Sequence, residues 1–573
     1  MKGDGCQVKQ EWKAFARAIA AASKREASVE EVEALLERPR DPAHGDVAFP
    51  CFRWAKKWKQ PPQAIAQMLA EQISHPKWEQ VEAVGPYVNV RFNRERVTQE
   101  VLSRILHEQG SYGSSYRGEG KTVVIDFSSP NIAKPFSMGH LRSTVIGHSL
   151  VRIARKQGFR VEGVNHLGDW GTQFGKLIAA FRRWGSEEAV KADPIRELLR
   201  LYVRFHEEMT ANPELEEEGR RWFKKLEDGD SEAQHLWHWF RKESLREFHR
   251  IYDWMGVTID HDHGEAFYND RMGPVVDALR EMGLLRHSEG AQVVDLTEEG
   301  LPPCLITKSD GATLYATRDL AAALYRRETF GFDYAWYVTG REQAVHFRQV
   351  FAVLKRMGHV WADRMEHIPF GMMLQNGKKM STRKGNVVLL EEVLQQAVAR
   401  AQKLIEQKNG TLADPEETAR QVGIGAVIFH DLKHDRLHDV EFSLDQMLHF
   451  DGETGPYLQY THARACSLLR KGKAANVVPG SLSLPVVMEE SWRVVTYLSD
   501  FPAVAAQAFD YRDPSRIARY LLQLGQAFNH YYAHVHILQE DGGKEARLAL
   551  VSAVAIVLKE GLHLLGMEAP EEV

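Results

Sequence analysis

The most constraining feature of this sequence is a strand–helix–strand pattern between residues 121 and 166. The run KTVVIDF is rich in β-branched residues and has the length of a buried strand. A loop of Ser, Pro and Asn follows, then the helical stretch MGHLRSTVIGHSLVRIARKQG, ended by Gly158, and a second strand, FRVEGVNH. Two strands joined through one helix in this way are parallel neighbours in a sheet, so the chain is predicted to contain an α/β domain.

Two later segments extend the predicted sheet. FDYAWYVTG followed by REQAVHFRQVFAVLKRMG has the pattern of another strand and helix, and HIPFGMMLQNGKKM that of a strand ended by an Asn-Gly turn. Between the two halves, the chain is mostly charged helix, such as ESLREFHRIYDWMG. We therefore predict a Rossmann-type α/β domain with a parallel sheet over 111–450, carrying a helical insertion at about 182–300.

The two ends of the chain predict separate domains, so the fold class is multidomain α/β. Residues 1–110 combine helical spacing, a turn-rich segment (PRDPAHGDVAFPCF), a basic helix with a Pro-Pro break and the half-buried strand GPYVNVRF, which indicates a small α+β domain. Residues 451–573 keep a helical pattern to the end and predict an all-α helical bundle. A chain of 573 residues has room for three such domains.

Composition excludes several classes of protein. The longest apolar run, LALVSAVAIVL, is about half of what a bilayer span needs, and the start lacks the apolar core of a signal peptide. Cys6, Cys51, Cys304 and Cys466 lie far apart without CxxC spacing, against both a disulfide framework and a cysteine-rich zinc site. The net charge of −5 means that any polyanion must bind at a local basic patch. We expect a reduced, cytoplasmic protein without a membrane span, and a monomer because no long exposed apolar seam stands out.

The segment SSPNIAKPFSMGHLRS, residues 128–143, lies between the first predicted strand and its helix. Ligands bind at this edge of a parallel sheet, and the amides of a helix N-terminus favour phosphate. His140 and Lys134 are therefore candidate contacts to a triphosphate. The alternative is that His140 only caps or packs the start of the helix.

A second basic segment, KKMSTRKGN at 378–386, directly follows a predicted strand. Lys379, Arg383 and Lys384 are candidates to close over a pyrophosphate leaving group, with Ser381 donating a hydrogen bond. A mobile basic loop suits a charge that exists mainly in the transition state. The alternative is a solvated basic turn.

With these motifs the chain resembles the class I aminoacyl-tRNA synthetases, SMGH corresponding to their HIGH motif and KMSTR to their KMSKS motif. More narrowly, it resembles the arginyl-tRNA synthetases over essentially its whole length. The segments that carry the resemblance in the central part are DFSSPNIAKPFSMGHLRST, NHLGDWGTQFG, DGATLYATRDL, YVTGREQAVHF and KMSTRKGN. The block from GPYLQYTHARA to FNHYYAHVHIL resembles the family's anticodon-binding helical domain, which the resemblance assigns to 451–573. HGD with GPYVN near the start resembles its N-terminal tRNA-elbow-binding domain, assigned to 1–110.

The resemblance implies a two-step reaction by positioning and electrostatics. Arginine attacks the α-phosphate of ATP, giving arginyl-adenylate and pyrophosphate, and the arginyl group then passes to the terminal ribose of tRNA. ATP with Mg²⁺ is the implied substrate, and no protein-bound structural metal is expected. The positions matching the family's ATP site and catalytic motifs are Ser137, Gly139, His140, Lys134, Met373, Lys379, Ser381 and Arg383.

The resemblance also implies an arginine pocket. A guanidinium presents a planar fork of five donors, which carboxylates meet best. Asp319, Glu265 and the Tyr315 hydroxyl match the positions that read the guanidinium. The remaining matches are Asp126, Asn131 and Gln343, for the α-amino and carboxylate groups, and His166, which we expect to shape the pocket. The alternatives are a helix N-cap for Asp319 and a surface carboxylate for Glu265.

Two positions depart from the family pattern. Ser137 stands where HIGH has its first histidine, and Thr382 where KMSKS has its second lysine. A serine can still donate one hydrogen bond to a phosphate oxygen. Lys134 or Lys384 is expected to supply the missing cation, so we predict a redistributed site rather than an inactive one.

Basic and aromatic residues at both ends of the chain are candidate tRNA contacts. At the N-terminal end, these are the helix 53–59 and the strand residues Asn89 and Phe92, an exposed Phe being able to stack on an unpaired base. At the C-terminal end, they are Tyr460, Arg464, Phe528, Tyr531 and Tyr532. Core packing is the alternative for each aromatic residue.

Two other functions remain open from the sequence. One is another adenylyl-transferring enzyme that acts on a small acid, although such chains are generally shorter and lack a helical anticodon domain. The other is a catalytically silent tRNA-binding regulator, which only Ser137 and Thr382 favour.

Overall fold

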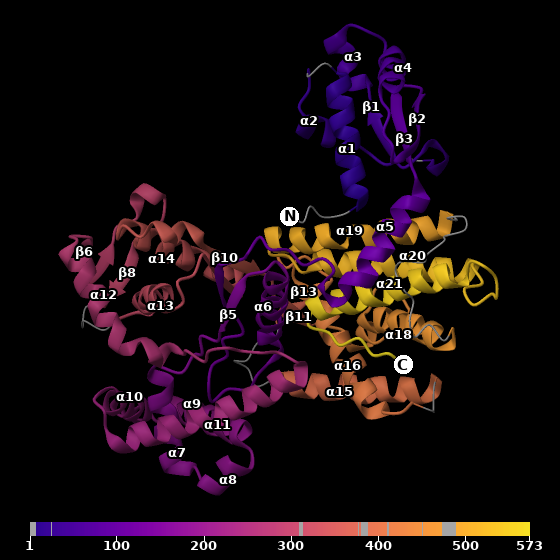
Figure 1. Ribbon diagram of the computed structural model, residues 1–573. Helices are drawn as coiled ribbons and strands as arrows, with labels where there is room; N and C mark the ends of the chain where they lie inside the picture. Colours follow the sequence, from indigo (N-terminus) through magenta and orange to yellow (C-terminus); the bar gives the residue numbers. More distant parts are fainter. Residues whose placement is uncertain are drawn as a thin grey trace.

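The chain folds into an N-terminal lobe, a central α/β lobe and a bundle of long helices, as the computed structural model shows (Figure 1). The structure describes residues 7–23, 26–39, 41–308, 313–375, 377–379, 388–408, 412–449, 451–472 and 489–573. The N-terminal lobe stands at the top of Figure 1, above the bundle, and the central lobe lies to the left. The predicted multidomain α/β class is confirmed.

A parallel four-stranded sheet with the order β10-β9-β4-β5 forms the centre of the α/β lobe. Its strands are β4 (Thr122–Asp126), β5 (Arg160–Val164), β9 (Tyr334–Gly340) and β10 (Met365–Phe370). Most of the apolar side chains of β4 and β9 are buried, which explains their β-branched and aromatic sequences. The chain leaves β4 for β5 on one side and returns to β9 on the other, so the topological switch point lies at the carboxyl end of β4.

Helices cover this sheet and position its carboxyl edge. The crossover helix α6 (Met138–Lys156) joins β4 to β5 and is buried along most of its length. It approaches the strand so closely that a Cβ at Gly147 would lie 2.2 Å from the Cβ of Phe127. The helices α13 (Tyr315–Phe330) and α14 (Ala344–Arg356) pack with the lobe's second hydrophobic core.

The segment expected as a helical insertion is helical for most of its length. It contains α8 (Glu187–Ala192), α9 (Pro194–Ala211), α10 (Glu214–Glu227), α11 (Ser231–Met255) and α12 (Asn269–Glu281). Its last part is not helix: β6 (Leu285–Ser288) and β7 (Ala291–Val294) pair antiparallel, and β8 (Cys304–Thr307) completes that sheet. The strands are short and partly exposed, so they carry little of the apolar periodicity that marks a strand in sequence.

The strand predicted over residues 367–380 is broken in two. It divides into β10 and β11 (Met373–Gln375), with Gly371 between them, where a Cβ would lie 2.4 Å from the carbonyl oxygen of His438. β11 pairs with β12 (Lys378–Lys379) and with β13 (Val440–Glu441).

The N-terminal lobe is a three-stranded antiparallel sheet with helices. Its elements are β1 (Val47–Pro50), β2 (Trp78–Val84), β3 (Tyr87–Phe92), α1 (Gln7–Ala22), α2 (Val29–Glu33), α3 (Phe52–Trp58) and α4 (Pro62–Gln72), followed by α5 (Arg94–Glu108), which runs to the bundle. The helix break predicted at the Pro-Pro pair is confirmed, because α4 begins at Pro62.

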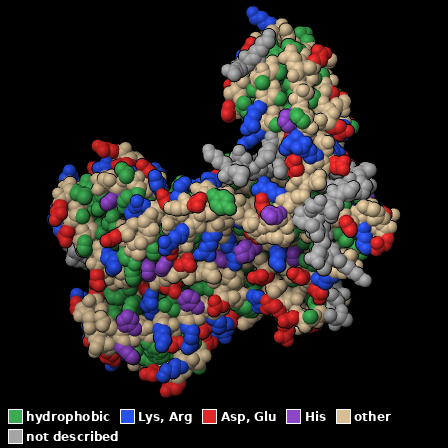
Figure 2. Space-filling model, viewed as in Figure 1, with side chains coloured by type: hydrophobic (Ala, Val, Ile, Leu, Met, Phe, Trp, Pro, Cys, Tyr) green, Lys and Arg blue, Asp and Glu red, His purple; other side chains and the backbone are tan. Residues whose placement is uncertain are grey.

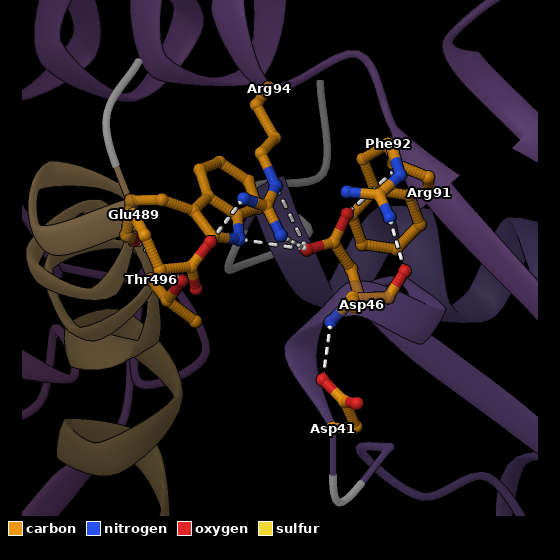
Figure 3. A network of polar contacts seen from close by, with 9 residues as sticks. Asp41, Asp46, Arg91, Phe92, Arg94, Glu489 and Thr496 are labelled. Carbon is orange, nitrogen blue, oxygen red and sulfur yellow. Dashed lines mark hydrogen bonds and ion pairs between the residues drawn. The ribbon is translucent and has the colours of Figure 1, made fainter.

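Asp46, in the turn before β1, links this lobe to the bundle (Figure 3). Its carboxylate accepts a hydrogen bond from the Phe92 amide at 2.8 Å and one from the indole N–H of Trp492 at 2.8 Å. It also pairs with Arg94 at 2.9 Å, and Arg94 reaches Glu489 of the bundle at 2.7 Å. The polar network therefore joins the start of α5 to the first turns of a bundle helix.

The bundle consists of helices from both sides of residue 451. They are α15 (Leu390–Lys408), α16 (Pro415–Leu432), the short α17 (Leu444–Met447), α18 (Gly455–Lys471), α19 (Glu489–Tyr511), α20 (Ser515–His534) and α21 (Lys544–Leu564). α16 packs against both α18 and α6, and a buried ion pair of 2.7 Å joins Arg142 of α6 to Asp431 of α16. Within the described ranges, none of the helices combines the length and the apolar character that a bilayer span requires.

Candidate active site

A strained loop connects β4 to α6 at the switch point of the sheet. Ser128, Ser129 and Ala133 have φ angles of 70°, 52° and 58°, a region that non-glycine residues seldom occupy. Hydrogen bonds hold these conformations: the Ser128 amide donates to the hydroxyl of Ser143 at 2.9 Å and the Ser129 amide to the side-chain oxygen of Asn165 at 3.0 Å. Backbone strain of this kind is typical of functional sites.

Ser137 and His140 meet at the first turn of α6. Ser137 is the N-cap residue; its hydroxyl lies 3.2 Å and its amide 3.3 Å from Nδ1 of His140. Burial, together with the charge of Lys134, lowers the pKa of His140 to about 4, so the ring is neutral at pH 7. The serine that replaces the first motif histidine therefore contacts the second histidine and fixes the position of its ring.

Space for a ligand lies beside this turn. Gly139 is exposed, and a Cβ there would meet only the Ser137 hydroxyl, at 3.5 Å. Lys134 lies on the loop before the turn, with its Nζ 5.3 Å from the centre of the Tyr202 ring on α9. Met373, the first residue of β11, is buried.

The residues that follow the basic loop, 388–390, lie close to this turn. Lys379 ends β12, but its side chain and the whole of Ser381, Thr382, Arg383 and Lys384 lie outside the described residues. After the loop, the Leu390 amide donates to the Phe136 carbonyl at 2.9 Å, and the Met138 amide donates to the Val388 carbonyl at 3.2 Å. Residues 388–390 are therefore joined by backbone pairing to residues 136–138 at the start of α6.

A chain of charged groups crosses the carboxyl edge of the sheet. Asp126, at the end of β4, forms an ion pair of 2.8 Å with Arg326 of α13, and the second Nη of Arg326 lies 3.4 Å from Nδ1 of His166. Nε2 of His166 is 3.8 Å from one carboxylate oxygen of Asp319, which also lies on α13. Nε2 of His346 is 2.5 Å from the other oxygen of Asp319. The structure thus brings Asp126, His166 and Asp319 together.

The electrostatics of this chain favour a neutral His166 and an ionised Asp319. Burial lowers the pKa of His166, although Asp126 and Asp319 oppose the shift. For Asp319, burial acts to raise the pKa, but the hydrogen bond of His346 and the nearby charge of Arg326 outweigh it and the pKa is lowered. The ring of His166 also stacks on Tyr268 at 5.5 Å.

Glu265 lies at the edge of the same pocket. It starts the 3₁₀ turn Glu265–Tyr268, and its carboxylate is 3.7 Å from Arg318. Its side chain is only 16% exposed, so it is not a surface carboxylate. Burial raises its pKa to about 7, although the charge of Arg318 opposes the shift.

The other predicted pocket residues differ in their exposure. Asn131 pairs through its backbone with Gly168 and is partly buried. Tyr315 begins α13 and is 67% exposed, and Gln343 is exposed directly before α14.

Several of the predicted tRNA contacts are buried. The rings of Phe92, Phe528 and Tyr531 are at most 2% exposed, so the expectation of accessible rings is wrong for these three. Phe92 lies on the core face of β3, and the other two lie on the inner face of α20. Asn89 is also buried, whereas the basic residues of α3 are exposed.

Arg464, Tyr460 and Tyr532 form a surface cluster on the bundle. The guanidinium of Arg464 lies 5.0 Å from the ring centre of Tyr460 and 4.9 Å from that of Tyr532, and it donates a hydrogen bond to Asn529. Tyr532 is 41% exposed. These residues keep an accessible aromatic face beside a cation. Figure 2 shows further Lys, Arg and His side chains gathered between the central lobe and the bundle.

Sequence reasoning missed Arg326 and His346. Arg326 lies two helical turns after Asp319, on a face otherwise lined by alanine and leucine. An arginine on such an apolar face must have a buried partner, and this signal was available. His346 lies three residues after Gln343, so one turn of a predicted helix separates them.

A parallel sheet with carboxylates and a helix N-terminus at its switch point defines an α/β enzyme that binds a nucleotide and a cationic substrate. The family model "tRNA synthetases class I (R), catalytic domain" matches residues 101–444, and those for the DALR anticodon binding domain and the arginyl tRNA synthetase N terminal domain match 458–573 and 11–92. The chain belongs to the arginyl-tRNA synthetases, and the resemblance seen in the motifs is confirmed.

Relatives match over almost the full length. The chain is 58% identical to an arginine–tRNA ligase of an Exiguobacterium strain, over 97% of this chain and 99% of that protein. It is 60% identical to an arginine–tRNA ligase of Exiguobacterium sibiricum, over 95% and 96%. The solved Thermus thermophilus arginyl-tRNA synthetase is 26% identical with a TM-score of 0.78, covering 98% of this chain and 99% of the other.

Proposed function

We propose that this chain joins L-arginine to its cognate tRNA in protein synthesis, with ATP as the activating substrate and arginyl-adenylate as the intermediate. The family membership and the relatives' shared activity support the reaction. In the first step, the carboxylate of arginine attacks the α-phosphate of ATP, and pyrophosphate leaves. In the second, the terminal ribose hydroxyl of tRNA attacks the activated carbonyl and AMP leaves.

The observation that carries the substrate assignment is the placement of two carboxylates at the carboxyl edge of the sheet, linked through Arg326 and His166. Asp126 ends β4 and Asp319 lies on α13, and His166 lies between them. Arginine carries a cation at each end, its α-amino group and its guanidinium. Two separated carboxylates match these two charges. A substrate with a single cation would leave one of the two carboxylates without a partner.

We assign the guanidinium to Asp319, Glu265 and the hydroxyl of Tyr315. Asp319 stays ionised beside His346, and Glu265 becomes fully ionised when a second cation joins Arg318. The α-amino and carboxylate groups fall to Asp126, Asn131 and Gln343. Most of this set lies on regular elements or next to them, which limits its movement.

ATP is assigned to the first turn of α6 and the basic loop. The open space beside Gly139 and the amides of the helix N-terminus suit the nucleotide and its phosphates. His140 is neutral and can donate a hydrogen bond to a phosphate oxygen from Nε2, with Nδ1 held by Ser137. The cations expected to contact the triphosphate and the leaving pyrophosphate are Lys134, Lys379 and Arg383. Ser381 is assigned as a further hydrogen-bond donor, and Met373 as a residue that contacts the nucleotide.

We infer that tRNA contacts both ends of the chain. Tyr460, Arg464 and Tyr532 offer stacking faces and a cation for unpaired bases. The exposed basic residues of α3 are the corresponding surface on the N-terminal lobe, and Asn89 would act there only through a rearrangement of β3.

ATP enters as its Mg²⁺ complex, which screens the triphosphate charge. Among the residues that the structure describes, no three His, Cys, Asp or Glu side chains come together as a metal site, and the absence of a structural metal stays a prediction. We infer a monomer in the cytoplasm, where translation occurs. Sedimentation at micromolar concentration tests the oligomeric state.

The decisive experiment is ATP–pyrophosphate exchange with arginine, with and without tRNA, followed by charging of tRNA. Arginine-dependent exchange and charging are expected. Exchange with another small acid in place of arginine would indicate a different adenylyl transferase. Binding of tRNA without any exchange would indicate a silent regulator.

A further inference from the structure

The buried guanidinium of Arg326 is a charged group of the site to which the proposed reaction assigns no contact. It is 1% exposed, and it lies 5.5 Å from the ring centre of Tyr337, which is the register partner of Asp126 on β9. Its two Nη atoms point to two different pocket residues, Asp126 at 2.8 Å and His166 at 3.4 Å. A planar fork is suited to such a bridging role.

The contact with Arg326 determines the tautomer of His166. A guanidinium has donors only, so Nδ1 of His166 must be the acceptor. The ring proton is then on Nε2, which faces Asp319 at 3.8 Å. The positive charge of Arg326 also disfavours a second proton on the His166 ring, whereas the negative charges of Asp126, Asp319 and Asp169 favour a second proton.

A protonated His166 would harm the pocket. It would be a cation beside Asp319, competing with the substrate guanidinium for the carboxylate and repelling it. His346 already occupies the other oxygen of Asp319 at 2.5 Å. One oxygen of Asp319 therefore stays available for a guanidinium only while His166 is neutral.

We propose that Arg326 is a positioning residue of the arginine site, which orients Asp126 and holds His166 in its neutral Nε2–H form so that Asp319 remains open to the substrate. Arg326 does not touch the substrate in this role. The inference rests on the arginine pocket assigned above, and it adds a residue that selects the protonation state of the pocket rather than a direct contact.

The test is the affinity for arginine at pH 8 and pH 6, measured by calorimetry on the whole protein. The wild type has its own pH dependence through Glu265, so the quantity compared is the ratio of variant to wild-type Kd. For Arg326→Gln this ratio is expected to be about fourfold higher at pH 6 than at pH 8. The factor is that of a histidine with its ordinary pKa of about 6.5 that binds arginine only in its neutral form, because about a quarter of the rings are neutral at pH 6 and almost all at pH 8. Arg326→Lys keeps the charge, and its ratio is expected to be the same at both pH values.

Two companion variants separate the causes. Adding His166→Asn to Arg326→Gln should remove the extra pH dependence. Arg327 lies on the same helix but donates to the Phe332 carbonyl, so Arg327→Gln should show no extra pH dependence. A ratio for Arg326→Gln that is equal at both pH values, or one that persists without His166, overturns the proposal. If Arg326 had a purely structural role, Arg326→Gln would weaken arginine binding equally at both pH values.

A measurement on the unaltered protein covers the case in which Arg326→Gln does not fold. In ¹⁵N-histidine spectra at pH 7, with His166 assigned through His166→Asn, a neutral Nε2–H ring is expected, and an Nδ1–H or doubly protonated ring contradicts the proposal. The pocket assignment itself is tested separately by Asp319→Asn. If that variant binds arginine normally, the pocket assignment is wrong, whereas a loss there with an unchanged ratio for Arg326→Gln rejects only the role of Arg326.

Discussion

At the scale of single residues, Asp319 carries the sharpest prediction for amino-acid choice. Its carboxylate is ionised and lies between His166 and His346. Asp319→Asn should lower kcat/KM for arginine by about 2–4 kcal/mol in transition-state terms, because a guanidinium loses its charged partner in a partly desolvated site. Asp363→Asn is the matched control, since Asp363 is 71% exposed and pairs only with Lys355. Unchanged arginine kinetics in Asp319→Asn would reject the assignment.

Glu265 makes arginine binding depend on pH. Burial raises the pKa of this carboxyl to about 7 in the free protein, and a bound guanidinium must lower it because a nearby cation favours the ionised form. The group whose pKa falls on binding releases its proton, so affinity is full above about pH 7 and declines below it, by up to about tenfold per pH unit.

This linkage has a direct readout. Calorimetry at pH 6.5 in two buffers with different ionisation enthalpies should detect a proton released on arginine binding. Glu265→Gln should abolish both the proton release and its share of the pH dependence, while binding more weakly at pH 8. Proton release that is the same in Glu265→Gln would show that another group is responsible.

At the scale of elements, the loop before α6 and the basic loop after β12 should act together on ATP. If Lys134 supplies the cation that Thr382 lacks, Lys134→Ala should cost at least about 2–3 kcal/mol in the activation step, because a charge-assisted phosphate contact is lost. Thr382→Lys in the same chain should recover part of this loss. The backbone pairing of residues 136–138 with 388–390 anchors the chain just after the basic loop to the start of α6, and this contact motivates the test.

A double-mutant cycle measures this coupling through pyrophosphate exchange with tRNA present. Lys191→Ala, at an exposed position of α8, is the control for loss of a lysine. Additive effects of Lys134→Ala and Thr382→Lys would show that Lys134 does not replace the missing lysine, and Lys384 would then be the better candidate.

Local patterns predicted the elements of the sheet because strands buried on both faces have apolar, β-branched sequences that few other structures require. The positions of Asp126, His140 and Asp319 followed from the same patterns and from the family motifs. The burial of Phe92 and the buried contacts of Arg326 did not, since each depends on which face of an element another element covers. The exposed strands β6 and β7 carried too weak a periodicity to be separated from the preceding helices.

At the scale of the whole molecule, the network around Asp46 joins the N-terminal lobe to the bundle, beside the packing of α5 against α19 and α21. Its carboxylate is 6% exposed and serves three donors, two from the lobe and one, the indole of Trp492, from α19. Gly45 beside it has a φ of 114° and lies so close to β3 that a Cβ would be 2.6 Å from the Val90 carbonyl oxygen. The turn is therefore built to place this one carboxylate, and a tRNA that contacts both ends of the chain needs the resulting orientation.

Asp46→Ala should therefore impair the use of tRNA without affecting activation. The loss of charged hydrogen bonds should lower the free energy of unfolding by about 2–3 kcal/mol, and the KM for tRNA should rise about fivefold, equivalent to about 1 kcal/mol of binding, as the lobe loses its fixed orientation. The KM values for arginine and ATP should not change, because the site at the sheet edge shares no residue with this network.

Trp492→Phe removes only the donor from the bundle and should give a smaller effect in the same direction. Asp510→Ala, which breaks an exposed pair with Arg117, is the control and should leave the KM for tRNA unaltered. A destabilised Asp46→Ala protein with a normal KM for tRNA would mean that the network stabilises the fold but does not orient the lobe for tRNA.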